Sequence, residues 1–159
     1  MVVHLRPAEL ELSLLSLFAG WAMTDELQRR LAADGLGELR FNDGVVIQHV
    51  LAGPLSITAL AERMGVTQQA ASKTVADLER RGLLTREPAP DDGRAKNLAL
   101  TEQAKRAVDK TREHRAQLEA ELVEEYGPRV ADARDLLAAI LTRFDADDAI
   151  RHRRVRPPA

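Results

Sequence analysis

Two short apolar helical patterns joined by a glycine-containing turn constrain the fold more than any other feature of the chain. Thr58 is a candidate N-cap for a helix in which Leu60 and Ala61 share a face, and Gly65 suits the left-handed residue that ends such a helix. Thr67 is positioned as the next N-cap. Because two helices would meet through a turn of about three residues, the pattern predicts a helix-turn-helix.

The second of these helices has one apolar and one polar face. Four residues have the spacing i, i+3, i+4 and i+7 that directs side chains into a core: Ala71, Thr74, Val75 and Leu78. The opposite face of the first two turns carries polar residues: Gln68, Gln69, Ser72 and Lys73. Gln can bond an adenine edge twice, Ser can donate or accept, and Lys suits guanine or phosphate. We therefore predict a recognition helix whose N-terminal end enters the major groove, against the alternative of an ordinary amphipathic helix.

A β-hairpin is predicted to follow. Gly82 ends the helix, and residues 83–87 and 95–101 have the composition of two short strands around a turn rich in Pro, Asp and Gly. Leu98 and Leu100 alternate with polar or small residues, so we expect one buried and one open face. Helix-turn-helix and hairpin together form a winged helix.

The hairpin carries the remaining candidate contacts to DNA. Arg94 at its tip suits a narrow minor groove, with Asp92 close enough to orient it, and Arg86 and Lys96 are placed to reach phosphates. The predicted DNA-binding residues are therefore Thr67, Gln68, Gln69, Ser72, Lys73, Arg86, Asp92, Arg94 and Lys96.

Four further helices are expected around this segment. Their apolar spacings predict helices over residues 8–33, about 41–51, 102–126 and 129–146. Aromatic residues make up only 3% of the chain, which favours an aliphatic, mainly α fold with a small β wing. Because the apolar stripes are narrow, we expect the first, fifth and sixth helices to pack together across a dimer interface, or else within one chain.

The chain is expected to form one integrated domain with four parts. These are N-terminal helices (1–54), the winged helix-turn-helix (55–101), C-terminal dimerisation helices (102–150) and a basic tail (151–159). The tail either touches phosphate or is solvated, and we favour the solvated state.

Composition limits the alternatives. The chain has no cysteine, which excludes disulfides, thiolate metal sites and thiol redox switches. The net charge is −2, but residues 63–112 carry eleven Arg or Lys against seven Asp or Glu, a local excess that suits DNA. No apolar run of membrane-spanning length and no secretory signal is visible, so a cytoplasmic protein without membrane contact is expected.

The same segment resembles the MarR family of regulators, named for multiple antibiotic resistance. The run LAERMGVTQQAASKTVADLERRGLLTRE resembles that family's helix-turn-helix and first wing strand, and DDGRAKNLALT resembles its wing tip, where Asp92 and Arg94 occupy the typical Asp and Arg positions. The resemblance implies a homodimeric repressor on a pseudo-palindromic operator in double-stranded DNA. It also implies release by a small, aromatic or anionic effector, and it implies no cofactor.

Other sites and activities have weaker support. Trp21 and His49 are the conspicuous candidates for an effector pocket, although both suit ordinary packing. The four histidines are scattered, which disfavours a metal site. An enzyme is disfavoured because Asp91 and Asp92 lie in a turn and no phosphate cradle or nucleophile elbow occurs. The remaining alternative is a winged-helix adaptor dimer that binds protein rather than DNA.

Overall fold

The computed structural model describes residues 6–37, 39–89 and 92–146, and it describes only the backbone of residues 41–42 and 92–95. Contacts between Cα atoms divide the chain into residues 1–38 and residues 39–159. The four-part division predicted from the sequence stays a prediction.

The described residues of the first unit, 6–37, form one long helix after a short 3-10 turn. A 3-10 turn, η1 (Pro7–Glu9), precedes α1 (Leu12–Ala33). The predicted start at residue 8 was wrong because Leu10 and Glu11 are extended, with ψ angles of 142° and 150°, and this conformation interrupts the helix. The helix ends before Gly35, whose φ angle of +72° is the left-handed conformation expected there.

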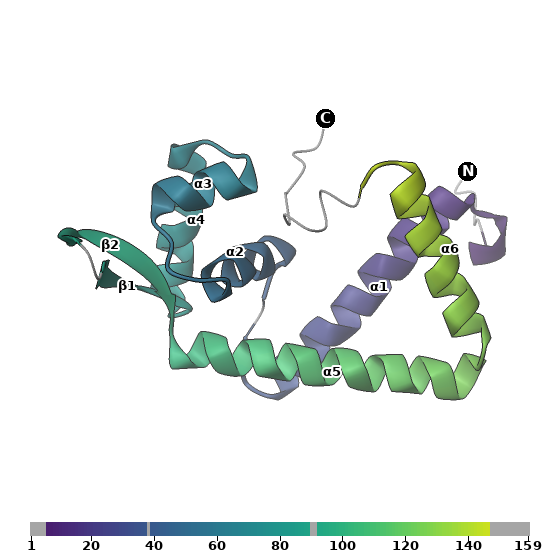
Figure 1. Cartoon of the computed structure of the whole chain (residues 1–159). Coiled ribbons are helices and arrows are strands. Elements are labelled where there is room, and N and C mark those ends of the chain that lie inside the picture. Colours follow the sequence, from purple (N-terminus) through teal and green to yellow (C-terminus); the bar gives the residue numbers. More distant parts are fainter. Residues whose placement is uncertain (1–5, 38, 90–91, 147–159) are drawn as a thin grey trace, which may run out of the picture. The chain divides into compact units, whose positions relative to one another are not determined.

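The second unit contains the remaining elements (Figure 1). In chain order they are α2 (Phe41–Leu51), α3 (Ile57–Met64), α4 (Gln68–Arg80), β1 (Leu84–Ala89), β2 (Asp92–Leu100), α5 (Glu102–Tyr126) and α6 (Arg129–Arg143). A mainly helical fold with one two-stranded antiparallel sheet confirms the predicted fold class. Among the described residues, none of the helices is long and apolar enough to cross a membrane.

The core of this unit lies among α2, α3, α4 and the base of the hairpin. Its fully buried side chains are aliphatic: Val46, Ile47, Leu55, Leu60, Val75 and Leu78. Burial of each such side chain contributes about 1.5–3 kcal/mol, which stabilises the packing of α3 against α4.

Helix α3 is capped at both ends. Ser56, not Thr58 as predicted, is the N-cap of α3, because its Oγ accepts the Ala59 N–H at 3.2 Å. Gly65 ends α3 with φ +67°, as predicted, and the Val66 N–H donates to the Ala61 carbonyl at 3.0 Å. This is the bond pattern of a Schellman cap.

The hairpin is anchored to the core at its base. Leu84 pairs with Leu100 and Arg86 with Leu98, and a bulge follows Pro88. Leu98 also donates its N–H to the Leu55 carbonyl at 2.8 Å. The expected alternation of buried and open faces holds only in part, because Leu98 is buried but Leu100 is half-buried, like the residues flanking it.

The two C-terminal helices, α5 and α6, contact each other. Thr101 caps α5 by accepting the Ala104 N–H, and the same hydroxyl donates to the Gly82 carbonyl at 2.6 Å. The predicted helix over 129–146 ends earlier, at Arg143, because Asp145 has a left-handed φ of +56° that a helix cannot continue.

Candidate nucleic-acid interface

The candidate interface is built on α4, whose two faces differ sharply. The face toward the core is fully buried: Ala71, Val75 and Leu78. The predicted DNA-facing side chains are placed on the other side, where Gln68, Gln69 and Lys73 are exposed and Ser72 is half-buried. Lys73 makes no ion pair with the described residues. Amide and ammonium groups are therefore available to an external partner.

The N-terminal end of α4 is organised by two threonines. The Thr67 Oγ1 accepts the Ala70 N–H at 3.2 Å, which confirms its predicted place as the N-cap. Thr58, displaced from its predicted capping role, accepts the Gln68 Nε2–H at 3.3 Å. Since that bond uses one of the two amide hydrogens, the other hydrogen and Oε1 remain for a base edge.

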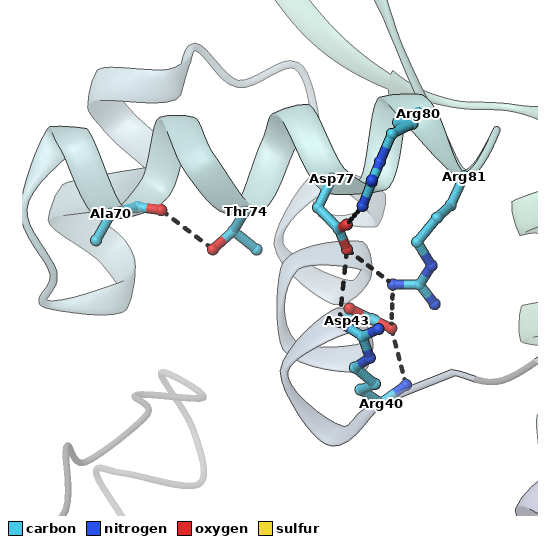
Figure 2. A network of polar contacts seen from close by, with 7 residues as sticks. All are labelled: Arg40, Asp43, Ala70, Thr74, Asp77, Arg80 and Arg81. Carbon is cyan, nitrogen blue, oxygen red and sulfur yellow. Dashed lines mark hydrogen bonds and ion pairs between the residues drawn. The ribbon is translucent and has the colours of Figure 1, made fainter.

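The C-terminal end of α4 is held by an ion-pair network with α2 (Figure 2). The Asp43 carboxylate is only 5% exposed, and its Oδ2 accepts a hydrogen bond from the Arg81 guanidinium at 2.8 Å. The same Oδ2 accepts the Arg40 N–H at 2.8 Å. Arg81 also donates to Asp77 Oδ2 at 3.3 Å. A buried carboxylate thus joins the start of α2 to the end of the candidate recognition helix.

Asp77 lies at the centre of the same network. It pairs with Arg80 and Arg81 and lies 3.7 Å from the Arg40 guanidinium. The hydrogen bond from Arg80 lowers the pKa of Asp77 below its ordinary value, with a smaller contribution from Arg81, while partial burial opposes the shift. Asp77 is therefore charged near neutral pH and keeps the network intact.

Arg80 is a candidate that the sequence analysis missed. Gln69, Lys73, Ala76 and Arg80 follow the spacing i, i+4, i+7 and i+11, which places them on one line along the helix. The Arg80 side chain is 77% exposed. The spacing alone could have identified it, and we add it as a candidate phosphate contact.

Four of the predicted DNA-binding residues lie in the wing: Arg86, Asp92, Arg94 and Lys96. Lys96 is exposed on β2. Arg86 on β1 pairs with Glu79 of α4, with Nε to Oε1 at 2.7 Å and Nη2 to Oε2 at 3.0 Å. For Asp92 and Arg94 the structure places the backbone in β2, but their side chains lie outside the described residues. Their predicted roles stay predictions.

The two predicted effector residues belong to different units. Trp21 on α1 is 54% exposed and contacts Phe18 edge to face, with ring centroids 5.3 Å apart. His49 on α2 is buried. Within the described part of the chain, no group of three or more His, Asp or Glu residues is arranged to hold a metal ion.

Known structures share this fold. The repressor CouR, solved on a 23-mer DNA duplex, is 24% identical, with a TM-score of 0.62 over 89% of this chain and 99% of CouR. A MepR variant from S. aureus bound to an oligodeoxyribonucleotide is 20% identical, with a TM-score of 0.58 over 87% and 99% of the two chains. A MarR family protein from Bacillus stearothermophilus is 18% identical, with a TM-score of 0.61 over 85% and 93%.

One segment of the chain matches a known protein family by sequence. No curated protein matches the chain at a significant level. The MarR family model matches residues 40–95, the segment from the N-cap of α2 to the middle of β2 that contains α3, α4 and the ion-pair network. Residues 40–95 thus match the MarR family of regulators, and the solved structures share the fold of the chain.

Proposed function

We propose that this chain binds double-stranded DNA as a homodimer and represses transcription from a pseudo-palindromic operator. The observation that carries the proposal is the composition of the exposed face of α4, where Gln68, Gln69 and Lys73 stand opposite a fully buried stripe. These groups suit base edges and phosphates. The CouR and MepR structures, each solved with DNA, support the same use of the fold. Members of this family are regulators rather than enzymes.

Exposed apolar side chains support the homodimer. Those on α1 are Leu12, Leu14, Leu15, Leu17, Phe18, Trp21 and Met23. Those on α6 and its C-cap are Leu136, Leu137, Leu141 and Phe144. Apolar groups of this number seldom stay in water on a monomer, so a second copy of the chain is the partner that we propose for them. Two-fold symmetry then places recognition helices about 34 Å apart.

We also propose that a small aromatic or anionic effector releases the DNA. MepR has been solved with ethidium bromide, at 20% identity and a TM-score of 0.58, which supports a ligand-responsive fold. Trp21 and His49 remain the candidate contacts. An effector can act only by binding the DNA-free arrangement more tightly than the DNA-bound one.

Selection of bound duplexes from a random pool, followed by titration at several salt concentrations, tests the proposal. We expect two half-sites centred about 10 base pairs apart or a multiple of that distance, and log affinity that falls steeply with log salt. Arg94→Ala should weaken binding to every sequence, whereas Gln69→Ala should change preference at particular bases. No selected sequence and a flat salt response would overturn the proposal in favour of the adaptor.

A further inference from the structure

The ion pair between Glu79 and Arg86 links the recognition helix to the wing. Both oxygens of the carboxylate and two nitrogens of the guanidinium take part, at 2.7 and 3.0 Å. This is the planar, two-bond geometry that Arg forms with carboxylates and Lys cannot. The pair spans Gly82, which lies between Arg81, the C-cap of α4, and Leu84, the first residue of β1.

The register of the hairpin explains why Arg86 faces α4. Arg86 lies directly opposite Leu98, and opposite residues of an antiparallel pair project from the same face. Leu98 is only 3% exposed, so that face is the one turned to the core. The exposed fractions of the paired side chains, 39% for Arg86 and 28% for Glu79, indicate partial shielding from water.

Arg86 is already ion-paired within the protein, unlike a cation whose side chain is available to bind phosphate. The Arg86 side chain donates two hydrogen bonds to Glu79, and these bonds raise the pKa of Arg86 above its ordinary value, against a smaller opposing effect of desolvation. Lys73 on the same helix is exposed and makes no ion pair with the described residues. The two cations are therefore prepared differently.

A wing needs such a restraint. A two-stranded hairpin is marginally stable alone, and DNA binding by a winged helix requires α4 and the wing to fit neighbouring grooves at the same time. A small rotation of the hairpin about Gly82 would displace its tip by much more than its base. A restraint between α4 and β1 limits that rotation.

Building on the proposed DNA binding, we propose that Arg86 is a positioning residue that holds the wing against the recognition helix through Glu79, and that it does not contact phosphate. We name the Glu79–Arg86 pair the wing clamp. Its role replaces the phosphate contact that the sequence alone suggested for Arg86.

The test measures operator affinity against salt for Glu79→Gln, Arg86→Gln, the double variant and the charge exchange Glu79→Arg with Arg86→Glu. We expect each single change to weaken binding on the order of three- to tenfold, and the double change to weaken it no further, because both remove one interaction. The salt slope should not change, and the exchange should restore most of the affinity. Lys110→Gln, which breaks the exposed Lys110–Glu113 pair of α5, is the matched control and should have no effect.

Two results would overturn the wing clamp. A salt slope that falls by about 0.9 in Arg86→Gln would show a lost phosphate contact, and tighter binding by Glu79→Gln would show that Glu79 competes with DNA for Arg86.

Amide hydrogen exchange in the free protein tests the wing clamp without DNA. Faster exchange in β1 and β2 of Glu79→Gln, with α5 unchanged, is expected, because the hairpin loses its restraint. If β1 and β2 exchanged at the same rate in Glu79→Gln as in the wild type, the wing clamp would be refuted. This result does not depend on DNA, whereas a wild-type protein that bound no duplex would refute the proposed function.

Discussion

The two ends of α4 both carry polar residues but differ in what their side chains contact. In the N-terminal part, residues 67–73, the side chains of Gln69 and Lys73 are exposed, and Gln68 makes one long hydrogen bond to Thr58. In the C-terminal part, residues 77–81, Asp77 and Arg81 are paired with the start of α2, and Glu79 is paired with β1. Arg80 pairs with Asp77 of the same helix and stays largely exposed. One helix thus combines an available end with an anchored end.

Replacing a side chain should therefore have different consequences at the two ends. The exposed side chains of Gln69 and Lys73 give up only water when DNA binds, so their replacement should alter affinity and leave folding almost unchanged. Groups at the anchored end are already paired inside the protein, so their replacement should alter folding or geometry first. Each prediction below can break this separation.

The largest effect is expected from Asp43→Asn. The change leaves the half-buried Arg81 guanidinium without its closest carboxylate, and breaking such a pair should lower the free energy of unfolding by about 2–4 kcal/mol. Chemical denaturation measures this. Asp109→Asn is the matched control, because the exposed Asp109–Arg112 pair at 3.5 Å should contribute about 0–1 kcal/mol. If the two variants were equally stable, α4 would not be anchored at Asp43.

Gln69→Ala should have the next largest effect, on DNA rather than on folding. Loss of a two-point contact to one base should reduce discrimination at that position by about 1–3 kcal/mol, while stability stays within about 0.5 kcal/mol because the side chain is exposed. Titration with operators that differ at single positions measures it. Gln117→Ala, an exposed change on α5, should leave all positions unaffected. A loss of stability in Gln69→Ala would contradict the separation.

Thr67→Ala tests the start of the available end. The change removes the acceptor for the Ala70 N–H and should destabilise the protein by about 1 kcal/mol. Thr67→Ser keeps the acceptor and should stay near the wild type. Thermal unfolding compares the two. If Ala and Ser were equivalent, this cap would not contribute to α4.

Local patterns in the sequence predicted much of this architecture. The spacing of Ala71, Val75 and Leu78 predicted the buried stripe of α4, and Gly65 and Thr67 predicted the turn before it, because these features depend on neighbouring residues alone. The anchored end carries no such signal.

What the sequence did not predict depends on distant residues. Asp43 and Arg81 are 38 positions apart, and neither forms a periodic pattern with the other. The Glu79–Arg86 pair required the register of the hairpin, which places Arg86 on the face of Leu98. Ser56 and Thr58 are both good N-caps, and only the folded turn, in which Thr58 meets Gln68, distinguishes them.

The smallest effect, from Thr58→Val, addresses whether the available end is completely unrestrained. Valine has the shape of threonine but cannot accept the Gln68 Nε2–H, and because that bond is long and exposed, its loss should cost only about 0.5 kcal/mol. We expect about a twofold weaker preference at the base that Gln68 reads, with no change at other positions. Thr58→Ser, which keeps the hydroxyl, is the control. A Thr58→Val protein with wild-type preference at every base would show that Gln68 is oriented by DNA alone. A loss of base preference as large as that of Gln68→Ala would show that Gln68 depends on its contact inside the protein, like the residues of the anchored end.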